Sequence, residues 1–238
     1  MSSKQNIEQE IDEAVGSIKE EQSWLLTYAD MMTLLFAFFV LLFSLSTIDP
    51  VKVSQLQDGM GDKPELKSFN QITKEFEEIL EELNIEDQAK VSRDPRGITL
   101  EIDGDICFKS ASTTLHDKLI QVLDLAAQKV LAQSDDPRLI TVEGHTDSAP
   151  IPEGLIHIFP TNWELSSARA SKVVNYLIDI GVNSGKLQAS GYADRWPASL
   201  SWYDVRSGQV NDSVIMENNK TEEQKKLNRR IKIVFSQN

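Results

Sequence analysis

One acidic residue, Asp30, lies inside the most apolar stretch of the chain, YADMMTLLFAFFVLLFSLS (28–46). No Lys, Arg or His occurs from Gln22 to Ile48 to neutralise it. An acid at the centre of a bilayer costs roughly 2.5–3.5 kcal/mol, and ionisable residues there usually serve function. We therefore interpret Asp30 as a carboxylate that binds and releases a cation. The alternative is a tolerated acid near the start of the helix, where the helix dipole favours negative charge.

The helical pattern places Asp30 on a stripe of mostly small or polar residues. The stripe consists of Asp30, Thr33, Ala37, Leu41, Ser44 and Ile48, and the opposite side carries Phe36, Phe39 and Phe43. Small and hydroxylic residues suit contact between helices, whereas bulky aromatic residues suit lipid. Because one helix cannot line a transport path alone, the sequence predicts membrane partners.

A second group of polar residues gathers in GHTDSAP (144–150) and TNWELSSARA (161–170). Asp147 falls in a loop after a predicted strand, and Arg169 falls on the next predicted helix. Such a pair can hold a ligand that carries both an ammonium and a carboxylate, because arginine binds carboxylates through two parallel hydrogen bonds. A plain ion pair between Asp147 and Arg169, or an aspartate that caps a turn, is the alternative, and spacing alone favours it.

Several classes of function find no support in the residues. The three histidines, His116, His145 and His157, and the single Cys107 lack metal-ligand spacing. The chain has neither a Gly-rich phosphate loop nor a nucleophile elbow, so we expect no enzyme and no cofactor beyond an ion. With 37 acidic against 24 basic residues and a net charge of −13, the chain is not expected to bind nucleic acid.

The apolar run predicts one membrane crossing. Leu25–Ile48 is long enough, at about 1.5 Å per residue, to cross a hydrocarbon core of about 30 Å. The acidic, polar start does not fit a cleavable signal peptide, so we expect a cytoplasmic segment at 1–21 and a transmembrane helix at 22–49. The lysines near the ends lean against this orientation: Lys19 precedes the helix, and Lys52, Lys63 and Lys67 follow it. A long C-terminal domain can nevertheless be translocated.

Beyond the membrane segment, residues 50–65 form a Pro- and Gly-containing linker, and residues 66–87 carry an amphipathic helical pattern. From 88 to 238 helices alternate with strands. The pattern predicts a hairpin in KVSRDPRGITLEID and strands in RLITVEG, LQASGYA and NRRIKIVFS. Helices are predicted in HDKLIQVLDLAAQKVLAQ and TNWELSSARASKVVNYLIDIG, the second with a capping box at Thr161 and Glu164. We expect an α+β fold, a two-layer α/β sandwich, with a polar insertion at Asp194–Leu227.

These segments together resemble a known family. WLLTYADMMTLLFAFFVLLFSLSTID resembles the transmembrane segment of flagellar stator B subunits, the MotB/PomB family. EGHTDSAP, NWELSSARASKVVNYLIDIG, ASGYAD and NRRIKIVF resemble the OmpA/MotB-type peptidoglycan-binding domain. The pairing is more specific than either part, because OmpA-like domains occur in many envelope proteins.

The resemblance implies a single-pass protein of the bacterial inner membrane with a periplasmic C-terminal domain. It implies a homodimer inside a pentameric ring of MotA-type A subunits, which act on the flagellar rotor. Asp30 would be the residue that binds the coupling ion, H⁺ or Na⁺, and we lean towards H⁺. Residues 51–64 would act as a plug in unassembled units.

The resemblance also assigns a wall-binding site. Asp147 and Arg169 would hold the diaminopimelate of peptidoglycan, with Thr146 and Leu165 nearby. Asn162, Ser166 and Arg229 match the wider motif of the domain.

The function we expect is a stator subunit that couples ion flow to torque and anchors the motor to peptidoglycan. A static OmpA-like wall tether is the first alternative, and Asp30 argues against it because a tether needs only an apolar anchor. An ion-driven unit of a non-flagellar system, such as phage defence, is the second. An enzyme is the most distant alternative.

Overall fold

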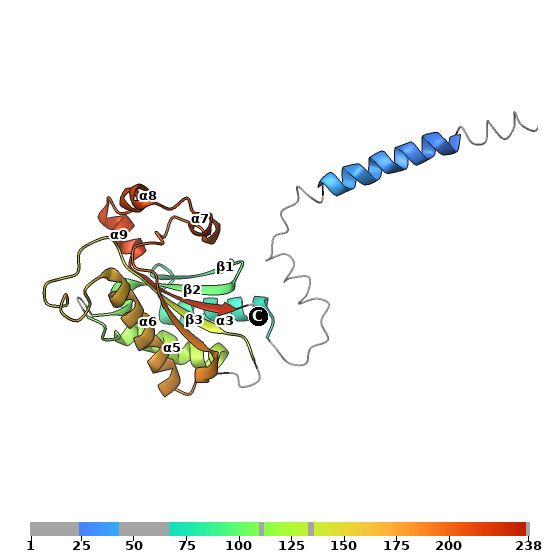
Figure 1. The fold of residues 1–238 in the computed structure, drawn as a ribbon. Coiled ribbons are helices and arrows are strands. Elements are labelled where there is room, and N and C mark those ends of the chain that lie inside the picture. Colours follow the sequence, from blue (N-terminus) through green and yellow to red (C-terminus); the bar gives the residue numbers. More distant parts are fainter. Residues whose placement is uncertain (1–23, 43–66, 110–111, 133–135, 237–238) are drawn as a thin grey trace, which may run out of the picture. The chain divides into compact units, whose positions relative to one another are not determined.

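The structure, a computed structural model, describes residues 24–42, 67–109, 112–132 and 136–236. The chain divides into two units, Met1–Ile48 and Asp49–Asn238, which are considered separately. Residues Trp24–Leu42 of the first unit form an α-helix, and within the described residues it alone is long and apolar enough to cross a membrane (Figure 1). The rest of the predicted transmembrane segment 22–49, the segment 1–21 and the linker 50–65 lie outside the described residues.

The second unit is built on a five-stranded sheet with the order β1-β2-β5-β3-β4. The strands are β1 (Ala89–Asp94), β2 (Gly97–Asp103), β3 (Ile140–His145), β4 (Leu187–Gly191) and β5 (Arg230–Ser236). β1 and β2 form the predicted hairpin, and β3 and β4 are the parallel pair. β5, the last strand of the chain, pairs antiparallel with both β2 and β3, so the C-terminal strand is central.

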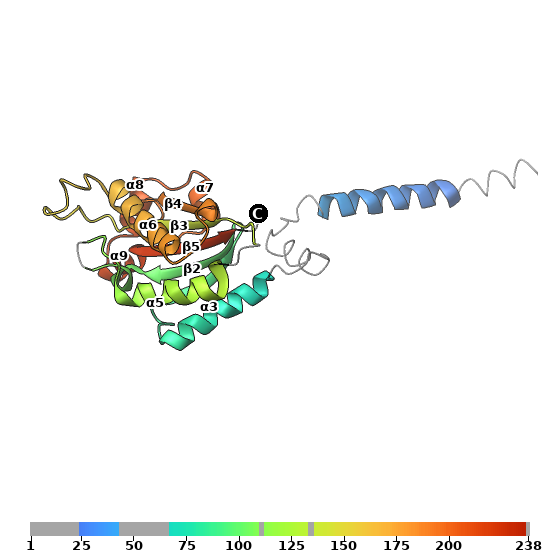
Figure 2. The ribbon, with the colours of Figure 1, turned by 90° about the horizontal axis from the view of Figure 1, so that it is seen from below.

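Three long helical segments cover one face of this sheet (Figures 1 and 2). They are α3 (Phe69–Leu83), α5 (Asp117–Ala126) continued by a π-helical turn at Ala127–Leu131, and α6 (Asn162–Asp179). Alternate strand residues and one stripe of each helix form the core, which includes Phe76, Ile98, Leu100, Leu123, Ile140, Leu177, Ile233 and Phe235. This arrangement confirms the predicted two-layer sandwich.

The opposite face of the sheet carries charged residues, some of them buried, rather than a second apolar layer. Neighbouring strands place Lys90, Glu101, Lys232 and Glu143 side by side, so that positive and negative charges alternate across β1, β2, β5 and β3. Lys90 Nζ and Lys232 Nζ lie 3.1 and 3.3 Å from the Glu101 carboxylate. We call these four residues the charged face.

The predicted insertion Asp194–Leu227 is folded, and Trp196 anchors it to the charged face. Trp196 is 2% exposed, and the Arg96 guanidinium and Lys232 Nζ lie 4.9 and 4.8 Å from its ring centroid. Arg230 Nη2 donates to the Trp196 carbonyl at 3.0 Å. The rest of the insertion contains three short helices, α7 (Trp202–Arg206), α8 (Asp212–Glu217) and α9 (Glu222–Asn228), on the other side of the sheet from α5 and α6 in Figure 1.

His145, at the end of β3, is fully enclosed beside Trp196. Its ring stacks on Tyr192 with centroids 5.3 Å apart, and it meets Trp196 edge-on at 5.7 Å. Burial lowers the pKa of His145 well below its usual value, and the positive charges of Arg230 and Lys232 lower it further. His145 is therefore a neutral packing residue at physiological pH.

Candidate functional site

The loop after β3 and the start of α6 meet because two glycines allow close packing. A Cβ on Gly144 would lie 2.1 Å from the Ser166 carbonyl oxygen, and a Cβ on Gly191 would lie 2.2 Å from Ser167 Oγ. Any side chain at either position would push α6 away from the ends of β3 and β4. The glycines thus bring the Asp147 loop and the helix that carries Arg169 to one end of the sheet.

The start of α6 also holds the loop directly. Thr161 and Glu164 form the predicted capping box, which fixes the first turn of the helix. Asn162 follows the cap, and its Nδ2 donates to the carbonyls of Asp147 and Ala149 at 3.3 and 3.1 Å. Asn162 therefore holds the backbone of the Asp147 loop against the start of α6.

Two further predicted site residues on α6 are buried in the packing of the domain. Ser166 is fully buried, and its Oγ donates to the Trp163 carbonyl and accepts from the Ala193 N–H, both at 3.1 Å. Leu165 is 5% exposed. Both side chains support the site from within the fold.

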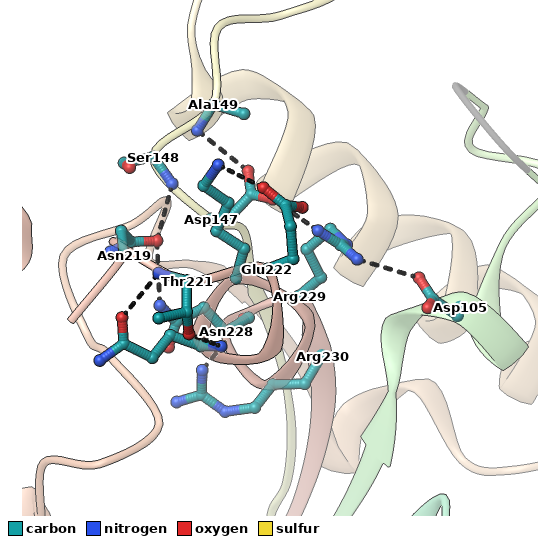
Figure 3. Close-up of polar contacts among 12 residues, drawn as sticks. Asp105, Asp147, Ser148, Ala149, Asn219, Thr221, Glu222, Asn228, Arg229 and Arg230 are labelled. Carbon is teal, nitrogen blue, oxygen red and sulfur yellow. Dashed lines mark hydrogen bonds and ion pairs between the residues drawn. The ribbon is translucent and has the colours of Figure 1, made fainter.

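Asp147 makes its ion pair with Arg229, at the end of α9 (Figure 3). Asp147 Oδ1 accepts from the Ala149 N–H at 3.0 Å, and Oδ2 accepts from Arg229 Nη1 at 2.7 Å. Arg229 Nη2 reaches Asp105 Oδ1, on the short helix α4 (Gly104–Cys107), at 3.4 Å. Burial opposes the charge of Arg229, but its bonds to Asp147 and the charge of Asp105 outweigh burial and raise its pKa.

Arg169 has a different environment, and the plain Asp147–Arg169 ion pair considered from sequence does not form. The guanidinium lies 4.9 Å from the centroid of the Phe108 ring, and its Nε and Nη2 donate to the Ser112 carbonyl at 3.4 and 3.3 Å. Among the described residues it has no carboxylate within ion-pair distance. Burial lowers the pKa of Arg169, while the charge of Asp147 opposes that effect.

Thr146 contributes a polar atom that the fold leaves unused. Its backbone N–H donates to the Ala193 carbonyl at 2.8 Å, which fixes the residue against the start of the insertion. Its side chain is 4% exposed, and Oγ1 has no hydrogen-bond partner in the part of the chain that the structure describes. An unpaired buried hydroxyl is costly, so it favours a site that a ligand or water completes.

The site combines a negatively charged hydrogen-bond acceptor, the Asp147 carboxylate, with a positively charged donor, the Arg169 guanidinium. A carboxylate has about four lone-pair positions, and two protein donors occupy only part of this capacity at Asp147. A guanidinium has five N–H donors, and Arg169 uses two of them on one carbonyl at long distance. An acidic acceptor and a basic donor of this kind suit a ligand that carries both an ammonium and a carboxylate.

Asp30 lies on the apolar helix of the first unit. The helix is exposed along its whole length within this chain, so its side chains require lipid or partner helices. Thr33 Oγ1 donates to the Asp30 backbone carbonyl at 2.8 Å. The Asp30 carboxylate has no hydrogen bond or ion pair with any residue that the structure describes, and it remains available to a cation.

Sequence reasoning missed Asp105, which bonds Arg229, and Asn219, which bonds the Ser148 N–H next to Asp147. Asp105 and Asn219 are far from the loop in sequence, and only the central position of β5 brings the end of α9 to it. The asparagines in ENNK (217–220) and NRR (228–230) were a usable signal. Asparagine side chains often bond to nearby backbone groups, so these residues could have been expected to hold a loop.

The chain was compared with known protein families. Residues 9–63 match the family described as membrane MotB of the proton-channel complex MotA/MotB, and residues 107–209 match the OmpA family. The protein YtxE of Bacillus subtilis strain 168, described as uncharacterised, is 31% identical over 92% of each chain. Motility protein B of the same strain is 24% identical over 90% of each chain.

Among solved structures, the fold is similar to the cell wall anchor of the T6SS from Pseudomonas aeruginosa. That similarity has a TM-score of 0.51 and 26% identity, and it covers 68% of this chain and 97% of that one. The first family match covers the apolar helix, and the second covers much of the sheet domain. YtxE is similar over both parts, because it matches 92% of the chain. The chain belongs to the MotB-like family of proteins that carry an OmpA-type domain.

Proposed function

We propose that this protein is an ion-driven stator subunit of the bacterial flagellar motor. In this role Asp30 loads and releases H⁺ or Na⁺, and the C-terminal domain anchors the stator to peptidoglycan. Membership of the MotB family and the N-terminal apolar helix fit a single-pass protein of the inner membrane. We further propose that the N-terminus is cytoplasmic, the C-terminal domain periplasmic, and the partners a second copy of this chain and MotA-type subunits.

The observation that carries this proposal is the lone carboxylate on a fully exposed apolar helix. A wall tether would need only an apolar anchor. An acidic residue would make membrane insertion of that anchor less favourable and would serve no function in it. Asp30 shares its stripe with Thr33 and Ala37, which allow a neighbouring helix to approach closely. A MotA-type wall around this stripe would complete the ion path that a single helix cannot form.

The wall-binding half of the proposal rests on Asp147 and Arg169. We propose that Asp147 holds the ammonium of diaminopimelate and Arg169 its carboxylate, with Thr146 Oγ1 as a further polar contact. The match to the OmpA family and the similarity to a cell wall anchor support this ligand class. Leu165 and Ser166 support the site, Asn162 shapes its loop, and Arg229 holds Asp147 until the ligand arrives.

The test of the proposal is swimming of a deletion strain complemented with either the wild-type gene or Asp30→Asn. The variant keeps the size and polarity of the side chain but cannot ionise. Wild-type complementation should restore swimming, and the variant should not, at equal amounts of membrane-inserted protein. Swimming that needs the gene but tolerates the variant would leave a wall tether as the better function.

A non-flagellar ion-driven unit is the second candidate, and one observation favours it. The chain is more similar to YtxE than to Motility protein B of the same Bacillus strain, at 31% against 24% identity. A single organism thus carries two relatives that need not serve the same system. Normal swimming of the deletion strain, combined with ion flux that depends on Asp30, would support this candidate.

A further inference from the structure

Two buried amide side chains, one in the insertion and one directly after it, connect the insertion to the loop that carries Asp147. Asn219, just after α8, is 6% exposed, and Asn228, the last residue of α9, is 2% exposed. Buried amides are expensive unless their donors and acceptors are paired. The way these two are paired links the insertion to the proposed ligand site.

Asn219 contacts the loop itself. Its Oδ1 accepts from the Ser148 N–H at 3.0 Å (Figure 3). Its Nδ2 donates to the Ile215 carbonyl at 2.8 Å. Ser148 directly follows Asp147, so this bond fixes the peptide plane next to the ligand-binding carboxylate. Without Asn219, the Ser148 N–H would lose the partner that the structure gives it.

Asn228 holds Asn219 in place. Its Nδ2 donates to Asn219 Oδ1 and to the Asn218 carbonyl, both at 2.9 Å, and its Oδ1 accepts from the Ala198 N–H at 2.7 Å. Both amides thus have their donors and acceptors engaged, which fixes the orientation of each side chain. Arg229, the ion-pair partner of Asp147, is the next residue, so Asn228 also fixes the backbone from which that arginine extends.

The Asp147 loop is consequently held from two sides. Asn162 of α6 binds the carbonyls of Asp147 and Ala149, and Asn219 of the insertion binds the N–H of Ser148. Three backbone groups of the loop are thus engaged, and the Asp147 carboxylate keeps lone pairs that a ligand can use. Precise placement of a binding group depends on such supporting hydrogen bonds.

We propose that Asn219 and Asn228 are positioning residues of the wall-ligand site, and that the insertion 194–227 is a structural part of that site. This inference rests on the proposed function, since it deepens the account of the same site. Loss of the Asn219 acceptor should leave the fold intact, free the Ser148 N–H, and weaken ligand binding about tenfold, the effect of one lost hydrogen bond.

The experiment compares Asn219→Ala with Asn218→Ala in the full chain in detergent. Asn218 is a matched control, because its side chain bonds within the insertion, to Ser199 Oγ and the Val214 carbonyl, and does not contact the loop. Two quantities are measured: co-sedimentation with purified peptidoglycan sacculi, and hydrogen exchange of the Ser148 amide. Asn219→Ala should weaken binding and speed exchange at Ser148, and Asn218→Ala should change neither.

A conservative variant separates positioning from general packing. Asn219→Asp keeps the acceptor for the Ser148 N–H but loses the donor to the Ile215 carbonyl, so it should restore Ser148 protection and binding in part relative to Asn219→Ala. Should Asn219→Ala not fold, Asn228→Asp makes the same test, because a carboxylate cannot donate to Asn219 Oδ1. Unchanged binding and unchanged Ser148 exchange in the folded variants would overturn the inference.

The same experiment distinguishes failure of the inference from failure of the proposed function. A wild-type chain that does not sediment with sacculi would refute wall binding. Exchange at Ser148 would then still decide whether Asn219 holds the loop. Binding by the wild-type chain that is equal in both alanine variants would leave wall binding standing and remove the positioning role.

Discussion

Replacement of Arg169 by alanine is the change that most sharply separates ligand binding from fold stability. The guanidinium lacks a carboxylate partner among the described residues, and its bonds inside the protein are two long contacts to the Ser112 carbonyl, at 3.3 and 3.4 Å. Its packing on Phe108, 4.9 Å from the ring centroid, is the other contact that alanine removes. A structural arginine would have stronger partners than these.

These contacts set the expected magnitudes. The stacking on Phe108 is worth about 0.5–1 kcal/mol, so the folded domain should lose no more than about 1–2 kcal/mol. A hydrogen bond from a charged donor to a ligand carboxylate is worth about 1.5–3 kcal/mol. Since about 1.4 kcal/mol corresponds to a tenfold change in affinity, Arg169→Ala should weaken wall binding roughly 10- to 150-fold. Arg169→Lys should recover only part of this, because lysine cannot form two parallel bonds.

The assay is co-sedimentation of the full chain in detergent with purified sacculi, run beside a thermal melt. Arg206→Ala is a matched control, because Arg206 also lies over an aromatic ring, Trp202 at 5.9 Å, but belongs to α7 in the insertion. Undiminished binding by Arg169→Ala would refute the ligand role. A parallel loss of binding and of the cooperative melt would make Arg169 a structural residue instead.

Two further predictions concern ionisable residues near the site, Arg229 and His145. Arg229→Ala should destabilise the domain by about 1–3 kcal/mol, because it leaves the Asp147 carboxylate, 10% exposed, without its ion-pair partner; a thermal melt that matches wild type would contradict this. His145 has a lowered pKa because it is buried and lies near Arg230 and Lys232. The unfolded chain binds a proton below about pH 6.5, so stability should fall with pH below that value. His145→Phe should flatten the dependence of melting temperature on pH, and an unchanged dependence would show that other groups cause it.

The sequence predicts the elements of the fold well where local signals are strong. The capping box at Thr161 and Glu164 marks the start of α6, and the DPRG turn marks the hairpin of β1 and β2. α3 is shorter than the predicted 66–87, because Ser68 caps its start and Asn84 ends it in the left-handed conformation. Each of these features depends on residues a few positions apart.

The site is predicted less completely because its contacts are distant in sequence. Arg229 is a candidate from the motif, but its bond to Asp147 joins residues 82 positions apart, and no periodicity encodes it. Asp105 enters the site because α4 follows β2 at the same end of the sheet as the end of α9. The insertion looks like a polar loop in sequence because few of its apolar side chains are buried, among them Trp196 and Ile215, and because the amide of Asn219 is buried through its bond to Asn228.

The central claim is that ion movement through Asp30 drives rotation, and single-motor rotation tests it most directly. A bead attached to the flagellar stub would report speed in strains that carry wild type or Asp30→Asn, with sodium varied at fixed pH. We expect rotation in wild type and none in the variant; a wild-type speed that rises with sodium would identify Na⁺ as the coupling ion, and a speed independent of sodium would identify H⁺. Equal rotation in both strains would contradict the claim and leave the protein as a wall anchor.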